Sequence, residues 1–158
     1  MLKLIKVFLA VVICEAIGIL GSIFTISQIS IWYQHLNKPF FSPPNFIFAP
    51  VWTTLYALIG ISIFLIFESK AKRKEKNNLL FLFSFHLFLN LLWSILFFGM
   101  HLLPAAFIEI VFLWGIILLL IIKFYKHSKL ASYLLIPYLV WVSFAAILNL
   151  FIVILNSV

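Results

Sequence analysis

Residues 46–76 read FIFAPVWTTLYALIGISIFLIFESKAKRKEK, and this stretch decides the fold of the chain. Its first 22 residues carry no charged side chain, whereas seven of its last nine residues are charged. A bilayer core about 30 Å thick takes roughly 20 helical residues to cross, so residues 46–67 have the length and composition of one transmembrane helix. The charge cluster that follows belongs at the lipid headgroups, because ionised groups are costly in hydrocarbon. This stretch therefore predicts a membrane span that ends in a basic loop.

Four further apolar segments of similar length predict an all-α membrane protein that folds as a five-transmembrane-helix bundle. Of the 158 residues, 66% are hydrophobic and 9% are charged, which leaves too little polar surface to coat a water-soluble globule. The five spans and their loops use up the chain, so a single domain is expected over residues 1–158. Pro137 is expected to kink the last span. The predicted spans are residues 7–26, 46–67, 79–100, 102–122 and 130–155, and an aromatic, proline-rich loop covers residues 27–45.

The basic residues are distributed unevenly over the predicted loops. The N-terminus and the second and fourth loops share one side of the membrane in a five-span protein. They hold 10 of the 11 lysines and arginines, and Lys38 alone lies opposite. Cytoplasmic loops accumulate such residues, so we predict a cytoplasmic N-terminus and a C-terminus outside. A charge cluster between two spans is typical of this orientation signal, so no nucleic-acid partner is expected.

Three predicted spans each carry a stripe of aromatic rings mixed with amide, hydroxyl or small side chains at helical spacing. A buried amide is costly in lipid unless it is satisfied, which directs these stripes into the bundle. An aromatic cavity with few polar groups suits a flat apolar ligand. Ordinary helix packing, in which tryptophan fills space and asparagine bonds across an interface, explains the same spacing equally well. The stripes are Trp52 and Tyr56; Asn90, Trp93, Ser94 and Phe97; and Trp141, Ala145, Leu148 and Asn149.

Two carboxyl groups lie within predicted spans, Glu15 in the first and Glu109 in the fourth. Such groups indicate proton coupling or a cationic ligand, or else they stay uncharged and hydrogen-bond to a neighbour. Both interpretations stay open for Glu109, and the second is expected for Glu15. The four histidines are scattered along the chain, and no metal site is predicted. The chain shows no motif of a hydrolase, a kinase or a dehydrogenase.

The loop over residues 27–45 is unusually rich in proline and aromatic residues for a connector. Tryptophan and tyrosine collect at membrane interfaces, so an aromatic belt is one interpretation. Prolines also reduce the entropy that a loop loses on ordering. The loop is therefore also a candidate for a folded lid over the mouth of a helix-bundle cavity.

Three segments together resemble the signature stretches of the TspO/MBR family, the bacterial tryptophan-rich sensory proteins related to the mitochondrial translocator protein. They are WYQHLNKPFFSPPNFIFAPVWTTLY, NLLWSILFFG and LLIPYLVWVSFAAILN. The resemblance implies a five-helix bundle in the bacterial cell membrane, usually a homodimer. It also implies a cavity that binds porphyrins such as protoporphyrin IX, as ligand and without a required cofactor, and that accepts synthetic translocator-protein ligands.

The resemblance also implies which residues form the ligand site. Glu109 matches a family position where aspartate is frequent, whereas Phe41 stands where many members carry a tryptophan, so ligand affinity is expected to differ. Some members break down protoporphyrin in light through tryptophans that match Trp52 and Trp141, and catalysis here is an open hypothesis. The positions that match the family pocket are Tyr33, Trp52, Tyr56, Asn90, Trp93, Ser94, Phe97, Trp141 and Ala145.

Two other functions compete with porphyrin binding. A small proton-coupled transporter of hydrophobic or cationic compounds would use Glu15, although such exporters have four spans and lack a proline-rich aromatic loop. A ligand-sensing regulatory membrane protein would need no turnover and would signal to a partner through the loop over residues 27–45.

Overall fold

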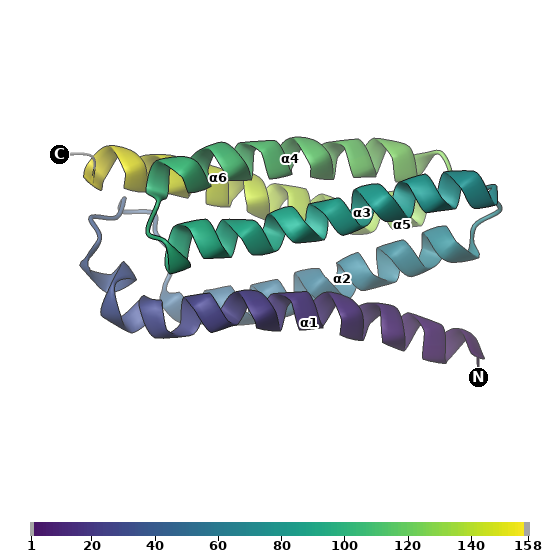
Figure 1. Cartoon of the computed structure of the whole chain (residues 1–158), viewed down its shortest axis with the longest axis horizontal. Coiled ribbons are helices and arrows are strands. Elements are labelled where there is room, and N and C mark those ends of the chain that lie inside the picture. The colour runs from purple at the N-terminus through teal and green to yellow at the C-terminus, as the bar shows by residue number, and fades with distance from the viewer. Residues whose placement is uncertain (1, 157–158) are drawn as a thin grey trace.

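The computed structural model describes residues 2–156 as a bundle of antiparallel helices (Figure 1). Five helical segments in this part of the chain are long and apolar enough to cross a membrane, which confirms the predicted fold class. The helices are α1 (Leu2–Ile31), α2 (Phe48–Glu68), α3 (Arg73–Ser94), α4 (Leu103–Tyr125), α5 (Lys129–Leu134) and α6 (Ile136–Asn156), with 3-10 turns at Tyr33–His35 and Asn45–Ile47 and a π-helical turn at Ile95–Gly99.

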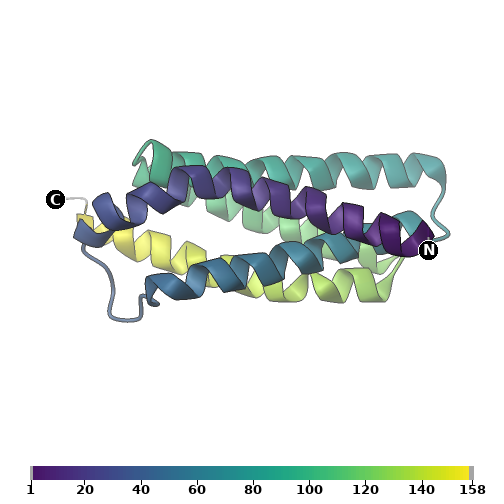
Figure 2. The same cartoon turned by 90° about the horizontal axis from the view of Figure 1, so that it is seen from below.

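The two ends of the bundle carry different connections. One end holds the start of α1 and the basic α2–α3 and α4–α5 links, and we call the adjoining half of the bundle the basic half (Figures 1 and 2). The opposite end holds the α3–α4 turn, the end of α6 and residues 32–44, which we call the lid. The half of the bundle below these residues is the lid half.

Helix α1 is longer than predicted, because it continues beyond residue 26 to Ile31. The polar residues near its end remain helical because their hydroxyl groups donate to carbonyls of the same helix. Thr25 Oγ1 donates to the Gly21 carbonyl at 3.1 Å, and Ser30 Oγ donates to the Ser27 carbonyl at 3.4 Å. The connecting segment is therefore shorter than the predicted loop of residues 27–45.

Helix α3 begins at Arg73, ahead of the predicted start at residue 79. The Glu75 carboxylate accepts the Lys72 backbone N–H at 3.2 Å, which satisfies one of the free donors at this helix terminus. An acidic residue in the first turn also suits the positive end of the helix dipole. Part of the basic cluster is thus the first turn of a helix, where a loop was expected.

The last span is broken as predicted near Pro137. Its helix is divided into α5 and α6 at Leu135. Proline has no N–H to donate and its ring clashes with the carbonyl four residues earlier, so regular helix stops just before it.

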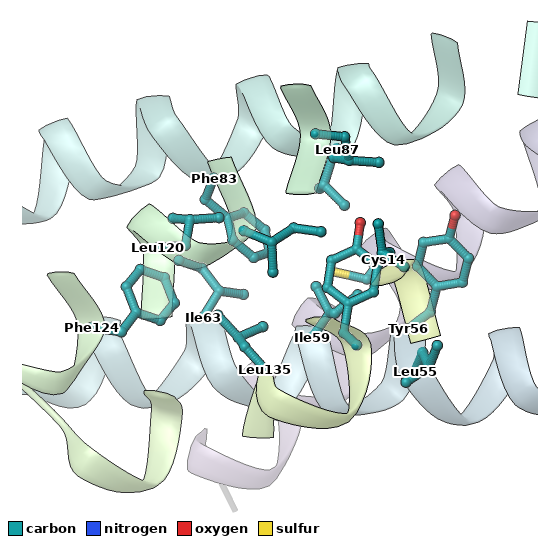
Figure 3. Close-up of a cluster of buried hydrophobic side chains, with 14 of the residues drawn as sticks. Cys14, Leu55, Tyr56, Ile59, Ile63, Phe83, Leu87, Leu120, Phe124 and Leu135 are labelled. Carbon is teal, nitrogen blue, oxygen red and sulfur yellow. The ribbon is translucent and has the colours of Figure 1, made fainter. Parts of the chain in front are cut away.

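The basic half has a closely packed core that is mostly aliphatic. Ile59, Ile63, Leu120, Phe124 and Leu135 point toward one another there (Figure 3), and each is at most 4% exposed. Helices α1 and α2 approach so closely in this half that a Cβ on the Gly60 position would lie 2.6 Å from the Val11 Cα, so only glycine fits. The lid half is built differently, as its side chains show.

Candidate ligand-binding site

A cavity of about 390 Å3 lies inside the lid half of the bundle. Its walls come from α1, α2, α3 with the π-helical turn, and α6; among residues 2–156, no residue of α4 lines it. The volume falls within the range of roughly 300–1,000 Å3 that small-molecule sites occupy. Its lining is largely apolar and aromatic, so the cavity suits a hydrophobic ligand with few polar groups.

The structure brings ten of the eleven predicted site residues together on this cavity, while the proposed binding role stays a prediction. These residues come from the lid and from three different helices, which explains why no single stretch of sequence contains the site. The ten are Tyr33, Trp52, Tyr56, Asn90, Trp93, Ser94, Phe97, Trp141, Ala145 and Asn149.

Glu109 is the one predicted site residue that does not line the cavity. It lies on α4 and is buried, and neither carboxylate oxygen has a hydrogen-bond partner among residues 2–156. Helix α4 packs behind α3 and α6, so these two helices separate its side chain from the cavity. The geometry therefore does not support direct contact between Glu109 and a ligand bound in this cavity.

At the floor of the cavity, toward the basic half, a chain of hydrogen bonds links side chains of three helices. Tyr56 O–H of α2 donates to the Asn90 Oδ1 of α3, and Asn90 Nδ2 donates to Tyr138 Oη of α6 at 2.9 Å. The Asn90 amide is thus satisfied by two phenols. This chain fixes the three helices relative to one another and positions the Tyr56 ring as part of the floor.

Asn149 makes a second connection between helices in the lid half. Its Oδ1 accepts from the Trp93 indole N–H at 3.2 Å, and its Nδ2 donates to the Leu103 carbonyl at 3.2 Å. The packing interpretation and the cavity interpretation of the stripes are therefore both correct: the amides hold helices together, and the rings that they position line a cavity.

Aromatic faces form most of the wall. The Trp52 and Tyr56 ring centroids lie 5.5 Å apart, Phe48 meets Trp141 edge-on at 6.0 Å, and Trp93 stacks on Phe97 at 5.0 Å. The Trp141 indole nitrogen is buried, and it has no hydrogen-bond partner within the described chain.

The lid is a folded structure that covers the outer end of the cavity. Tyr33 is 4% exposed and packs on Phe97 and Phe98, with ring centroids 6.2 and 5.8 Å away. Burial raises the pKa of the Tyr33 phenol above its ordinary value, so its O–H stays protonated at neutral pH. Lys38 Nζ donates to the Tyr33 carbonyl at 3.0 Å and lies 4.5 Å from the centre of the Tyr33 ring.

Hydrogen bonds and a ring contact attach the lid to the end of α6. The Asn37 backbone N–H donates to Asn156 Oδ1 at 3.0 Å, and Asn156 Nδ2 donates back to the Asn37 carbonyl at 2.9 Å. The Phe41 ring packs against Phe151 at 5.3 Å. The folded-lid interpretation of the proline-rich loop therefore describes its geometry better than a simple aromatic belt.

The sequence interpretation missed the contribution of α1 to the cavity. Gly18, Gly21, Ser22 and Thr25 line it, together with Glu15. The first four follow the spacing i, i+3, i+4 and i+7, the same pattern that identified the stripes on the other helices. Small and hydroxyl side chains carry this stripe, so a search for aromatic residues did not detect it.

Comparison with known proteins gives a consistent result over nearly the whole chain. Residues 10–155 match the family model described as the TspO/MBR family. The chain is 44% identical over 156 residues to a tryptophan-rich protein TspO of Archaeoglobus fulgidus, covering 99% of this chain and 98% of that protein. It is 37% identical over 119 residues to the translocator protein of Sus scrofa, covering 75% and 70% of the two chains. It is also similar to a tryptophan-rich sensory protein of Cereibacter sphaeroides, at 30% identity over 118 residues and 75% and 72% coverage.

Proposed function

Because this chain belongs to the TspO/MBR family, we propose that it is a membrane receptor for porphyrins, namely protoporphyrin IX and related tetrapyrroles, and for translocator-protein-type ligands. It is an integral multi-pass membrane protein with five apolar spans. The ligand would occupy the cavity under the lid, with no further cofactor required.

One observation carries this proposal: rings from the lid and from three helices converge on a single apolar cavity of about 390 Å3. A flat macrocycle offers two large π faces, and offset or edge-on contacts with protein rings each add about 0.5–1.5 kcal/mol beyond the area that they bury. The Trp141 N–H is buried and unpaired, so it would gain a hydrogen bond if a ligand carbonyl or carboxylate displaced the side chains that cover it. The cavity therefore combines a large apolar surface with few polar anchors, as specific sites for hydrophobic ligands do.

The test is a titration of the purified, detergent-solubilised protein with protoporphyrin IX, followed by quenching of tryptophan fluorescence. We expect saturable quenching, with a dissociation constant that rises at least about fivefold in Trp52→Phe and in Trp141→Phe, since each loses contact area and Trp141→Phe also loses the donor. Trp114→Phe is the matched control. Its indole donates to Ser143 Oγ at 2.8 Å and does not line the cavity, so its affinity should equal that of the parent. Quenching that does not saturate and is the same in all four proteins would contradict the proposal.

Light-dependent breakdown of porphyrin is a separate hypothesis, supported by the presence of the Trp52 and Trp141 indoles on the same cavity. The bound porphyrin is expected to lose absorbance under illumination faster in the parent protein than in Trp141→Phe at equal occupancy. Equal and stable absorbance in both proteins would remove the catalytic version and leave the binding proposal intact.

We further propose that the protein is a homodimer in the bacterial cell membrane, with its N-terminus cytoplasmic and the lid outside. The orientation is supported by the placement of the basic α2–α3 and α4–α5 links at the same end as the start of α1 (Figure 1). Labelling of single cysteines introduced at Lys74 and at Gln34 with a membrane-impermeant reagent tests it. Only the cysteine at position 34 should react in intact cells. Reaction of Lys74→Cys alone would show that the orientation is opposite to the proposed one.

Transport is the second candidate, because Glu15 lines the cavity. In vesicles, proton-coupled efflux of a cationic dye that is abolished by Glu15→Gln would favour a transporter. A purely regulatory receptor is distinguished by ligand-dependent crosslinking to another membrane protein.

A further inference from the structure

Glu15 is the only acidic or basic side chain among the described residues that line the cavity. It lies on α1 between the basic and lid halves and is partly buried. The residues nearest the basic half on the four wall helices are Glu15, Tyr56, Asn90 and Trp141, so Glu15 belongs to the cavity floor. A carboxyl group at this depth is costly unless a specific partner compensates it.

No group among the described residues supplies that partner. Within residues 2–156, Glu15 makes no hydrogen bond and no ion pair. The nearby Tyr56 hydroxyl is occupied by Asn90, and the two lysines of the same helix are engaged elsewhere: Lys3 and Lys6 lie 3.6 and 3.4 Å from the Glu68 carboxylate. The carboxyl group of this lining residue therefore has its hydrogen-bonding capacity unused.

A lysine lies next to one lining residue at the outer end of the cavity, although it does not line the cavity itself. Lys38 is the one lysine or arginine of the lid, and its ammonium group lies against the Tyr33 ring, which itself lines the cavity. Nζ donates one hydrogen bond to the Tyr33 carbonyl and retains two further donors. A ligand group that extends past Tyr33 at the outer end would meet this ammonium group, whereas Glu15 lies at the floor.

We propose that Glu15 is a specificity-determining residue that accepts a hydrogen bond from an N–H donor of the ligand, a cationic amine being its strongest partner. This inference rests on the proposed function, because it assigns an orientation to a ligand in the same cavity. Nitrogen donors point to the floor, and acidic groups of the ligand point to Lys38 and the lid. Carboxyl groups at the floor would instead meet Glu15 and be repelled.

The experiment compares two porphyrins that share a ring and differ in charge. One is protoporphyrin IX, with its two propionates, and the other is a derivative in which each propionate ends in a primary amine. Glu15→Gln keeps the size of the side chain and removes its charge. We expect Glu15→Gln to lower the affinity for the amine derivative at least about tenfold, as loss of a charge-assisted hydrogen bond does. The affinity for protoporphyrin IX should stay unchanged or rise.

Two further variants sharpen the result. Lys38→Gln should have the opposite effect on ligand preference: it should lower the affinity for protoporphyrin IX more than the affinity for the amine derivative. Glu68→Gln is the matched control: it removes a carboxylate that pairs with lysines at the basic end, far from the lining residues, and should leave both affinities unchanged. Retained binding of protoporphyrin IX shows that Glu15→Gln is folded. If that variant is too unstable to purify, Glu15→Asp replaces it. Its carboxylate is one methylene further from the ligand, so the affinity for the amine derivative should fall while the affinity for protoporphyrin IX does not.

If both probes bind saturably and Glu15→Gln changes the two dissociation constants by the same factor, or changes neither, this inference is overturned. The cavity would then remain the proposed binding site. Absence of saturable binding of either probe to the parent protein would overturn the proposed function and the inference with it. The two failures are therefore distinguishable in one set of titrations.

Discussion

The basic half and the lid half of the bundle are made by the same five spans and are packed in different ways. In the basic half, flexible or branched aliphatic side chains interlock, and Ser62 Oγ donates to the Ala131 carbonyl at 2.6 Å to join α2 to α5. In the lid half, rigid rings are held in place by hydrogen bonds between helices, and a cavity of about 390 Å3 remains. Aliphatic side chains can rearrange to fill space, whereas planar rings anchored at their polar ends cannot. The comparison indicates that one half provides stability and the other provides the site.

Removal of a large side chain from the basic half should have the largest effect on stability. Phe124 is fully buried there, and Phe124→Ala is expected to cost about 3–5 kcal/mol of unfolding free energy through lost contacts and a new cavity. Reversible denaturation in mixed micelles measures this. Leu119→Ala, at a partly exposed site on the same helix, is the control and should cost less than about 1 kcal/mol. A small effect of Phe124→Ala would mean that the basic half is not the stabilising one.

Replacement of a small side chain by a large one should affect the two halves most differently. Ala145 lines the cavity, so Ala145→Phe has space for the new ring and should abolish protoporphyrin IX binding with little loss of stability. Ala131 is fully buried in the basic half, and Ala131→Phe should cost about 1–3 kcal/mol or more through overpacking. Unfolding free energy and ligand affinity are measured for both variants. Equal destabilisation by the two would contradict the difference in packing.

Loss of the amide at the cavity floor should have an intermediate effect. Asn90→Leu leaves the Tyr56 and Tyr138 hydroxyls without their shared partner and is expected to cost about 1 kcal/mol, since hydrogen bonds between membrane helices average less than that each. It should also weaken ligand binding several-fold, because the Tyr56 ring is no longer fixed. Asn77→Leu, at an exposed position of α3, is the control. An unchanged affinity would show that ligand binding at the floor does not depend on these hydrogen bonds.

Release of the lid should have the smallest effect on stability. Asn156→Ala removes both hydrogen bonds to Asn37, and it should change the unfolding free energy by less than about 1 kcal/mol. Ligand dissociation should become about two- to tenfold faster, because the cover opens more often. Stopped-flow displacement of bound protoporphyrin IX measures this rate. An unchanged rate would mean that the ligand leaves by another route.

Much of the fold was predictable, because hydrophobic span length and basic loops are local properties of the sequence. The break before Pro137 followed from the chemistry of one residue, and the stripes of α2, α3 and α6 followed from helical spacing. Helix ends were less predictable. The hydroxyl groups near the end of α1 bond within the helix, and Glu75 caps α3, so polar sequence continued as helix in both places.

The remaining features of the site depend on contacts between distant segments. Spacing places Glu109 on a face of α4 without indicating that α3 and α6 lie between that face and the cavity. The Asn37–Asn156 contact joins residues 119 positions apart in the sequence, and no local pattern indicates it. The sequence analysis expected Glu15 to hydrogen-bond to a neighbour, but among the described residues it has no such partner and lines the cavity. Its place there was not predicted because the stripe that accompanies it is built from glycine, serine and threonine, which also occur in ordinary helix packing.

The most direct test of the central claim is the structure of the protein with protoporphyrin IX bound. We predict one macrocycle per chain under the lid, between α1, α2, α3 and α6, in contact with Trp52 and Trp141 and with its propionates toward Lys38. A macrocycle bound on the outer surface of the helices, with the cavity unchanged, would contradict the account.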